Sequence, residues 1–386
     1  MNVSGPILPG GTLGVVGGGQ LGRMFALDAR RMGYKVVVLD PDPESPTGQV
    51  ADDRVVAPYT DANAVRQLVE RCDVVTYEFE NVNADAVAEA EGSGHVRPGS
   101  HVLRIAQHRL IEKGALTENG FPVPEYAGVD TMTDMVNAVE RIGTPAVLKT
   151  ATSGYDGKGQ IVLRSAVDMR EAHTELRRQS VALILESFVP FDLEISVIAA
   201  RGPDGDVVCF PPSENQHVNG ILDVSIVPAR ISDEVRDAAV KLASRIAEAL
   251  DVVGLVAVEM FVTTAGELLV NEIAPRPHNS GHYTQDACAT SQFEQLVRAI
   301  CGLPLGSTEL LSPVVMANLL GDTWAAAGGT PDWDAALGVH GAVLHLYGKA
   351  EARIDRKMAH INVTAPDVET ALARALDARE RAAGRG

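Results

Sequence analysis

The sequence predicts a multidomain protein of the α/β and α+β classes, with a Rossmann-like domain first and a small β-rich domain last. Three observations predict this order. A strand, a glycine-rich turn and a helix follow residue 11, apolar strands alternate with helices through the middle of the chain, and from Ser312 the composition becomes rich in Ala, Gly and Leu. With 386 residues, the chain is long enough for two or three domains with substantial cores.

Composition limits the classes of ligand. The formal net charge is −18 at pH 7, which disfavours nonspecific binding to nucleic acid or to an anionic membrane. We therefore expect no nucleic-acid and no membrane partner, and a phosphate ligand would need local cations or metal ions. No signal peptide and no apolar run of membrane-spanning length is visible. The cysteines lack zinc-ligand spacing and are expected to be reduced thiols of a cytoplasmic protein: Cys72, Cys209, Cys288 and Cys301.

Turn-forming residues divide the chain. Residues 1–11 are rich in Gly and Pro and are expected to be a disordered lead-in. The GFPVP sequence that begins at Gly120 ends a helical segment and predicts a domain boundary. We predict a first domain over residues 12–120, a second over 121–308 and a third over 309–386.

The first domain opens with a βαβ pattern. Strand Thr12–Val16 runs into GGGQLG, which ends at Gly22, a helix is predicted over Arg23–Met32, and strand Lys35–Asp40 ends in an acid 18 residues after Gly22. This G-x-G-x-x-G pattern is typical of dinucleotide-binding folds, but its glycines serve any ligand whose phosphate or carboxylate caps the helix. A nicotinamide-dependent dehydrogenase stays an alternative, as does a tight turn that binds nothing.

Two acids follow the next predicted strand. A helix over Asp61–Cys72 leads into strand Val74–Asn81, which carries Glu78 and Glu80 near its carboxyl end. In an open parallel sheet this end faces the ligand crevice. Both acids are therefore candidates to hold a polar or amine-bearing substrate, and solvated acids would give the same pattern.

A helical segment over Leu103–Asn119 places Arg109 and Lys113 four residues apart on one face. Such cations are usually only solubilising, but an arginine beside a phosphate site would bind it. Beyond the predicted boundary, Met135–Arg141 is expected to be a short helix.

Two lysines and a glycine-rich segment predict a phosphate-binding hairpin. Strand Ala146–Lys149 ends in lysine, and TATSGYDGKGQ, which contains Lys158, leads into strand Ile161–Arg164. Such a hairpin can fold over a triphosphate while both lysines neutralise it. It is not a P-loop, because G-x-x-x-x-G-K-[ST] is absent. An exposed flexible hairpin is the alternative.

Weaker patterns follow. The apolar strand Leu183–Val189 turns at Pro190 and leaves backbone groups that could pair with an adenine edge. Glu194 could accept hydrogen bonds from ribose hydroxyls, and His217 lies in a polar loop that has no decisive pattern. Helix Ser232–Leu250 has Ser232 as its N-cap, and a further helix is expected over Gln292–Cys301.

Two apolar strands, over residues 253–262 and 267–274, carry one acid each, Glu259 and Glu272. If the four residues between them close a hairpin, Val262 faces Glu267 and Ala257 faces Glu272. Alternation then makes Glu259 and Glu272 diagonal neighbours on one face. A shift of the pairing by one residue would separate them.

Two carboxylates on an apolar face are costly unless a cation lies between them. Their hard oxygens favour Mg²⁺, which also binds substrate phosphates. We therefore predict a magnesium site at Glu259 and Glu272, with two solvated rim carboxylates as the alternative.

The last part of the chain carries a basic cluster. Strand Val343–Tyr347 precedes four cations in nine residues: Lys349, Arg353, Arg356 and Lys357. In so acidic a chain they suggest a contact with an anion such as a phosphate. A solvated basic hairpin is the alternative.

These motifs, in this order, resemble the ATP-grasp ligases and, within them, the N5-carboxyaminoimidazole ribonucleotide synthetase family. The matching segments begin at Gly17 (GGGQLGR), Tyr77 (YEFENV), Thr152 (TSGYDGKGQ), Glu214 (ENQHVNGI) and Asn271 (NEIAPRPHNSGH). One segment departs, since residues 353–360 read RIDRKMAH where the family pattern resembles RPGRKMGH. The replaced glycines affect the local turn and leave its cations in place.

The resemblance implies a pre-ATP-grasp domain, an ATP-grasp domain with a lid at about residues 121–190, and a C-terminal domain. It implies ATP-dependent carboxylation of 5-aminoimidazole ribonucleotide with bicarbonate, through carboxyphosphate, in purine biosynthesis. ADP and phosphate are the other products. Mg²⁺ is the implied cofactor, with Mn²⁺ able to replace it, and a cytoplasmic homodimer is the implied form. Ligases for other acids or amines, such as formate or amino acids, and a nonenzymatic nucleotide-sensing module remain alternatives.

The resemblance also implies roles for individual residues. The ATP contacts are Arg109, Lys149, Gly154, Tyr155, Asp156, Gly157, Lys158, Gly159, Gln160, Glu186, Ser187, Phe188, Val189, Glu194, His217, Asn271 and Glu272. The contacts to the ribonucleotide are Gln20, Leu21, Gly22, Glu78 or Glu80, Arg276, His278, Asn279, Ser280, Lys349 and Arg356. Glu259 and Glu272 hold the metal, and the catalytic residues are Tyr155, Lys158 and Arg276, with bicarbonate near Tyr155 and Arg276. The GYDGKGQ hairpin is expected to close over the site.

Overall fold

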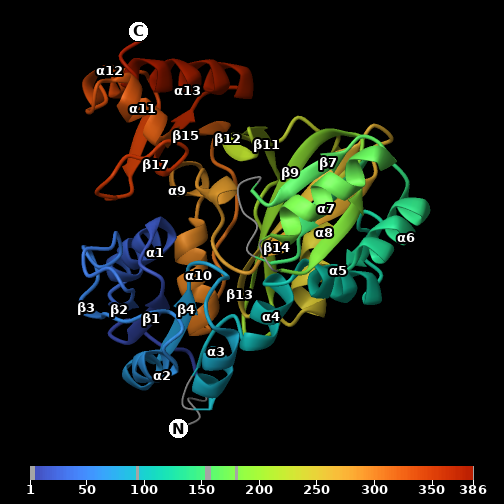
Figure 1. Cartoon of the computed structure of the whole chain (residues 1–386). Helices are drawn as coiled ribbons and strands as arrows, with labels where there is room; N and C mark the ends of the chain where they lie inside the picture. Colours follow the sequence, from blue (N-terminus) through green and yellow to red (C-terminus); the bar gives the residue numbers. More distant parts are fainter. Residues whose placement is uncertain (1–4, 93–94, 153–157, 179–180, 386) are drawn as a thin grey trace.

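The computed structural model describes residues 5–92, 95–152, 158–178 and 181–385 (Figure 1). Within these ranges the strands form a parallel sheet near the N-terminus, a small antiparallel sheet and a large sheet that reaches the C-terminal region. No helix in the described ranges is long and apolar enough to cross a membrane.

The first sheet is parallel and has the order β3-β2-β1-β4. Its strands are β1 (Thr12–Val16), β2 (Lys35–Leu39), β3 (Asp53–Val55) and β4 (Val74–Tyr77). Helix α1 (Gln20–Arg31) covers one face, and α2 (Ala62–Arg71) and α3 (Ala84–Glu91) cover the other. Helix α1 begins at Gln20, three residues before the predicted start, so Gln20, Leu21 and Gly22 form its first turn.

Two helices replace the single helical segment predicted over Leu103–Asn119. Helix α4 (Ser100–Ala106) ends before Gln107, and α5 (Arg109–Glu118) begins after His108. The prediction of one continuous helix was wrong, because polar groups at the break bind partners outside the two helices. The Gln107 side chain donates to the carbonyl oxygens of Glu80 and Val82, each at 2.6 Å, and the Arg109 N–H donates to Ala151 O at 2.8 Å.

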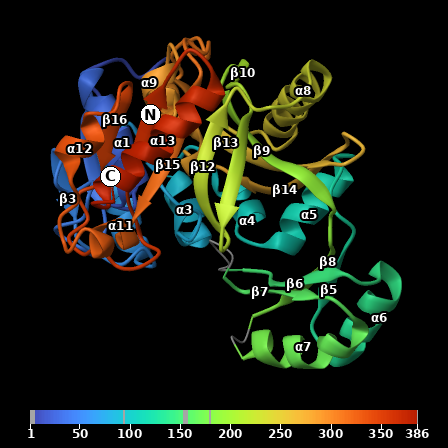
Figure 2. The same cartoon turned by 90° about the horizontal axis from the view of Figure 1, so that it is seen from above.

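The small sheet is antiparallel, with the order β5-β8-β6-β7, and projects from the rest of the molecule (Figure 2). Apolar side chains on one face pack under α6 and α7. The elements of this unit are β5 (Tyr126–Val129), α6 (Met132–Ile142), β6 (Ala146–Thr150), β7 (Gln160–Leu163), η1 (Ala166–Asp168), α7 (Met169–Arg177) and β8 (Leu183–Ser187).

The large sheet has the order β14-β13-β9-β11-β12-β15-β17-β16, with β10 paired to β9. Its strands are β9 (Phe191–Arg201), β10 (Val207–Cys209), β11 (Ser213–Val218), β12 (Ile221–Val227), β13 (Gly254–Thr263), β14 (Leu268–Ala274), β15 (Val314–Leu320), β16 (Ala342–Leu346) and β17 (Lys357–Thr364). Because β12 pairs with β15, the C-terminal strands continue the central sheet.

Helices cover the large sheet. Helix α8 (Asp233–Ala249) buries Leu242 and Ile246 on β13, and Ser232 caps its first turn by accepting from Val235 N at 3.3 Å. Helix α10 (Gln292–Cys301) packs between this sheet and α1, which joins the first domain to the second. The remaining elements are η2 (Asn279–Gly281), α9 (Thr284–Ala287), α11 (Gly321–Ala326), α12 (Trp333–Leu337) and α13 (Val368–Ala382).

Gly321 gives a test of packing in the C-terminal region. A Cβ there would overlap the carbonyl oxygen of Arg353, so Gly321→Ala must displace the segment that precedes β17. We expect it to lower the free energy of unfolding by about 1–3 kcal/mol, measured by urea denaturation. Gly114→Ala in α5 is the control, since a Cβ added there meets nothing within 4 Å beyond the adjoining backbone of its own helix. Alanine should stabilise that helix by about 0.5–1 kcal/mol. Equal effects of the two substitutions would contradict the close packing inferred at Gly321.

Candidate active site

Strands β13 and β14 place Glu259 and Glu272 directly opposite each other. The predicted diagonal arrangement was wrong, because Ala257 pairs with Ala274 instead of Glu272. The turn closes one residue later than predicted, with Thr263 N donating to Glu267 O at 2.9 Å. A bulge between the pairs Glu259–Glu272 and Met260–Val270 adds a second one-residue shift. Two shifts restore the alternation, so the acids share one face as predicted.

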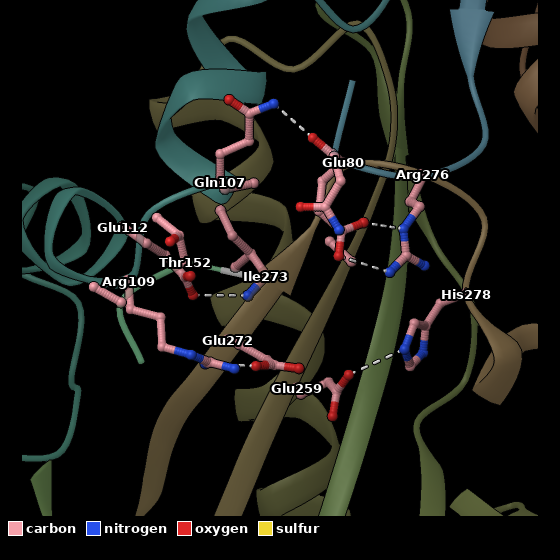
Figure 3. Close-up of a pocket in the computed structure, with 14 residues that line it drawn as sticks. Glu80, Gln107, Arg109, Glu112, Thr152, Glu259, Glu272, Ile273, Arg276 and His278 are labelled. Atoms are coloured by element: carbon pink, nitrogen blue, oxygen red, sulfur yellow. Dashed lines mark hydrogen bonds and ion pairs between the residues drawn. The ribbon is translucent and has the colours of Figure 1, made fainter. Parts of the chain in front are cut away.

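Each acid contacts a basic side chain in Figure 3. Arg109 Nη1 lies 2.7 Å from Glu272 Oε2, and His278 Nε2 lies 3.1 Å from Glu259 Oε1. Burial alone would raise the pKa of Glu272, but the charge and hydrogen bond of Arg109 lower it to about 2. A basic side chain thus lies against each carboxylate, Arg109 at Glu272 and His278 at Glu259.

The donors around this pair fit a hard divalent cation. Asn271, the extra residue of the bulge, has a buried Oδ1 without a hydrogen-bond partner and lines the same cavity as both acids. Two carboxylates and an amide oxygen suit Mg²⁺, which keeps waters and takes further ligands from phosphates. No cluster of three or more His, Cys, Asp or Glu that could hold a metal occurs in the described ranges, so the fit depends on this oxygen set.

Arg276 connects the second domain to the first. Its Nε and Nη2 donate to Glu80 Oε2 and Oε1 at 2.5 and 3.1 Å, a bidentate contact visible in Figure 3. Burial would raise the pKa of Glu80, but Arg276 holds it below its ordinary value. The Gln107 amide fixes the Glu80 backbone from the end of α4. Burial would lower the pKa of Arg276, but Glu80, and after it Glu259 and Glu272, raise it.

The small sheet contributes cations from the opposite side. Lys149 on β6 contacts Glu186 on β8 at 2.7 Å, and Glu186 is 2% exposed. Burial would raise the pKa of Glu186, but Lys113 and Lys149 lower it. Lys149, Lys158 and Gln160 line the cavity that contains the paired acids. Two lysines therefore line the same cavity as the paired carboxylates.

An apolar region adjoins the lysines. Phe191 and Phe261 stack with ring centroids 4.8 Å apart, and Phe188 lines the same cavity. The sequence prediction missed Phe191 and Phe261. Strand alternation could have found Phe261, which is two residues from Glu259 on the same strand and so on the same face. Glu194 pairs with Phe261 across the strands and contacts His217 Nδ1 at 2.6 Å. Glu194 raises the pKa of His217 against the effect of burial.

The glycine motif binds carboxylates of its own chain. Gly18 N donates to Asp40 at 2.6 Å, and Gly19 N and Gly22 N donate to Glu78, the latter at 2.8 Å. A Cβ at Gly19 would lie 2.5 Å from Glu78 Oε1. The glycines are therefore needed for the close approach of Glu78. Because their amides already donate to Asp40 and Glu78, they are not available to bind a dinucleotide. Burial raises the pKa of Glu78.

Together these elements enclose a cavity of about 480 Å³ between the first domain, the small sheet and the large sheet. Of the predicted residues, it is lined by Gln20, Leu21, Glu78, Glu80, Arg109, Lys149, Lys158, Gln160, Phe188, Glu194, His217, Glu259, Asn271, Glu272, Arg276, His278 and Asn279. Lining residues that were not predicted include Phe79, Val147, Val162, Phe191, Gly220, Leu222 and Phe261. Lys357, from the basic cluster predicted to contact an anion, also lines it.

Comparison with known proteins identifies the family. Residues 11–107 match the ribonucleotide synthetase preATP-grasp domain, residues 114–293 the ATP-grasp domain, and residues 314–374 the phosphoribosylaminoimidazole carboxylase C-terminal domain. An N5-carboxyaminoimidazole ribonucleotide synthase of Bacillus subtilis is 48% identical over 92% of this chain and 92% of its own length. The chain belongs to the N5-carboxyaminoimidazole ribonucleotide synthase family. It is an ATP-grasp ligase.

Solved structures of this synthase family agree in fold. An ADP complex of an N5-carboxyaminoimidazole ribonucleotide synthetase has a TM-score of 0.92 and 49% identity, covering 97% of this chain and 98% of that one. The Aspergillus clavatus synthase with ADP and 5-aminoimidazole ribonucleotide has a TM-score of 0.89 and 34% identity, covering 96% and 99%. The dehydrogenase hypothesis was wrong, and the synthetase resemblance is confirmed.

Several residues assigned from the synthetase resemblance do not line the cavity. Ser280 is fully buried, and its Oγ contacts His278 Nδ1 at 2.8 Å and Ser196 Oγ at 2.6 Å. Lys349 Nζ donates to Lys357 O at 2.7 Å, and Arg356 Nη1 to Glu351 O at 2.9 Å. The others of this kind are Gly22, Gly159, Glu186, Ser187 and Val189. Gly154, Tyr155, Asp156 and Gly157 lie outside the described residues.

The Glu80–Arg276 pair predicts a pH-dependent stability difference. The folded pKa of Glu80 is lowered, so the pair stabilises the fold above the ordinary carboxyl pKa and stops doing so as pH falls through the lowered value. Arg276→Met should lower the free energy of unfolding by about 3 kcal/mol at pH 7, because it leaves Glu80 charged and unpaired. The cost should shrink below about pH 4.

Urea denaturation of the parent and Arg276→Met at pH 7 and pH 3.5 (about one unit below an ordinary carboxyl pKa) measures this difference. Arg236→Met is the matched control, since Arg236 makes exposed ion pairs with Asp233 and Asp237 on α8. Because these ion pairs are exposed, the stability of this variant should stay close to that of the parent at both pH values. A cost for Arg276→Met that is equal at both pH values would contradict the role given to Glu80.

Proposed function

We propose that this cavity carries out ATP-dependent carboxylation of 5-aminoimidazole ribonucleotide with bicarbonate, through carboxyphosphate. The products are N5-carboxyaminoimidazole ribonucleotide, ADP and phosphate, and the pathway is purine biosynthesis, as membership of the family indicates. One observation carries the proposal: Glu259 and Glu272 are opposed within a cavity that also contains two lysines and an apolar pocket. That arrangement suits a nucleoside triphosphate with its metal ion.

ATP lies across the large sheet in this proposal. The apolar region formed by Phe188, Phe191 and Phe261 takes the adenine, because aromatic faces stack on a purine. Glu194, oriented by His217, accepts hydrogen bonds from the ribose hydroxyls. Lys149 and Lys158 then neutralise the phosphates from the side of the small sheet. Complexes of relatives with ATP and ADP support a nucleotide in this fold.

Glu259, Glu272 and Asn271 Oδ1 are the residues that would hold Mg²⁺, or Mn²⁺ in its place. When bound, the metal neutralises phosphate oxygens and so favours attack at the γ-phosphorus. Arg109 approaches Glu272 from the opposite side to the paired strand and keeps this carboxylate ionised. His278 Nε2 contacts Glu259 Oε1 and orients that carboxylate. The protein thus contributes a fixed set of ionised oxygen donors.

Arg276 serves the bicarbonate half of the reaction. Bicarbonate is a poor electrophile, because its carbon is shielded by negative charge and hydroxide is its leaving group. Transfer of the γ-phosphoryl group to bicarbonate gives carboxyphosphate, in which phosphate is the leaving group. This step brings two anions together, and the guanidinium of Arg276, fixed by Glu80, offsets their repulsion. Tyr155, the second residue predicted near bicarbonate, lies outside the described residues.

The ribonucleotide lies on the side of the first domain. Glu78, Gln20 and Asn279 line this part of the cavity, and both side-chain polar atoms of Asn279 are buried without partners. A buried amide of this kind is available to a ligand. The exocyclic amine of the ribonucleotide attacks carboxyphosphate, or CO₂ released from it, while the surrounding elements exclude water. The Aspergillus clavatus complex with ADP and 5-aminoimidazole ribonucleotide supports this substrate.

The proposal includes a cytoplasmic homodimer with domain limits near residues 120 and 308. Reduced cysteines support the compartment, since the four are free in the described structure. Analytical ultracentrifugation of the full chain tests the dimer, for which a single monomer mass at micromolar concentration would be contrary evidence.

Glu272→Ala tests the metal role. It should remove most ATP turnover, by a factor of about 100 or more, because the metal loses one of two carboxylates. ADP release is measured with ribonucleotide, bicarbonate and Mg²⁺ present. Glu267→Ala is the control, since Glu267 is an exposed acid of the same hairpin. Near-parent ADP release by Glu272→Ala would refute the metal role.

Product identification tests the reaction itself. ATP, Mg²⁺, ¹³C-labelled bicarbonate and 5-aminoimidazole ribonucleotide are mixed with the enzyme, and the product is examined promptly by mass spectrometry. Label in the carboxylated ribonucleotide, formed with one ADP per product, is the expected result. Parallel assays with formate and with amino acids separate the other ATP-grasp ligases. ATP turnover stimulated by one of these acids and not by bicarbonate would replace the proposal.

A further inference from the structure

The bulge in β14 determines where Glu272 lies. On the turn side of the bulge, Met260 pairs with Val270 and Val262 pairs with Leu268. If this pairing continued without the extra residue, Glu272 would lie opposite Val258. Val258 belongs to the apolar layer beneath α8, where a carboxylate would have no polar partner. The bulge therefore brings Glu272 to the cavity face.

A bulge interrupts the strand ladder and leaves backbone groups that need other partners. Lys113 is the partner of two of these groups: its Nζ donates to Val270 O at 3.0 Å and to Asn271 O at 2.7 Å. The Lys113 side chain is fully buried. On the other side of Glu272, Glu112 Oε1 accepts from Ile273 N at 2.9 Å, a contact visible in Figure 3.

One face of α5 thus makes hydrogen bonds to four consecutive residues of β14, 270–273. Arg109, Glu112 and Lys113 are three and four residues apart, the spacing that places side chains on the same face of a helix. Arg109 binds the Glu272 side chain, and the other two bind the backbone on both sides of it. Arg109 touches a group assigned to the metal, whereas Glu112 and Lys113 donate to or accept from the backbone of β14. Glu112 also lines a small pocket beside Glu272, so its test needs a variant that keeps the backbone hydrogen bond.

We infer that Lys113 and Glu112 are positioning residues, which hold the β14 bulge and thereby set the opposition of Glu259 and Glu272 that binds the metal. This inference rests on the proposed function, since it concerns the same metal site. Loss of the Lys113 ammonium leaves two buried carbonyl groups without a donor, and the strand relaxes toward continuous pairing. The metal ligands then separate although neither has been changed.

Mn²⁺ binding tests the inference apart from catalysis. Electron paramagnetic resonance measures the Mn²⁺ affinity of the full chain in the presence of a nonhydrolysable ATP analogue. Lys113→Met, which keeps the length and removes the donors, should weaken Mn²⁺ binding roughly 10- to 100-fold. Lys113→Arg retains donors and should recover part of this loss. Lys241→Met, at an exposed position of α8, should bind as the parent does.

Hydrogen exchange gives a second measurement that does not require Lys113→Met to fold. The amide of Ile273 should exchange slowly in the parent and at least tenfold faster in Glu112→Ala, which removes its acceptor. Glu112→Gln keeps an acceptor oxygen and should restore slow exchange and Mn²⁺ affinity. Unchanged exchange in Glu112→Ala would overturn the role of Glu112.

Comparison with Glu272→Ala separates the possible failures. If the parent binds Mn²⁺, Glu272→Ala loses it and a folded Lys113→Met binds at parent affinity, the inference is wrong and the proposed metal site stands. Reduced thermal stability of Lys113→Met with parent Mn²⁺ affinity would likewise overturn the inference. If Mn²⁺ binding by the parent does not depend on Glu272, the proposed function itself fails at the metal site.

Discussion

The opposition of two carboxylates within an apolar hairpin is the constraint around which this structure is arranged. Glu259 and Glu272 repel each other, and burial increases the cost. The surrounding residues offset this cost. Arg109 contacts Glu272, His278 contacts Glu259, and the positive charge of Arg276 attracts both acids. Each of these basic side chains is held in turn by a neighbouring element. These contacts form only when the first domain, α5 and the loop after β14 are correctly placed relative to one another.

Much of the fold was predictable from local patterns. Helices over Asp61–Cys72, Ser232–Leu250 and Gln292–Cys301 were predicted to within about one residue, because apolar periodicity and capping residues agreed. The pairing of Glu259 with Glu272 was predicted only in part. The turn and the bulge each shifted the register by one residue, and two errors cancelled in the face assignment. The turn shift has a local pattern, a three-residue loop with Gly266 at positive φ. The bulge has none, because Lys113, which binds its backbone, is distant in the sequence.

The glycine motif shows why a short pattern does not identify a ligand. Its spacing is that of a dinucleotide site, and its helix begins within the motif, at Gln20. The amides nevertheless bind Asp40 and Glu78, and both acids follow strands of the same parallel sheet. The sequence places those acids at strand ends but cannot say that they point back to the glycines. The aromatic pair was missed for a related reason, since Phe191 and Phe261 meet only when β9 and β13 are paired.

The arrangement of the three sheets also determines which parts can rotate. Ladder hydrogen bonds between β12 and β15 tie the C-terminal strands to the central sheet, so turning one against the other would break backbone pairs. In the described structure the small sheet has no strand ladder with the large one. Its covalent connections are short crossings near Pro122 and Pro190. A hinge at these crossings would change the separation of Lys149 from Glu272 without breaking a strand ladder, so entry of a nucleotide and departure of its product would require no unzipping of either sheet.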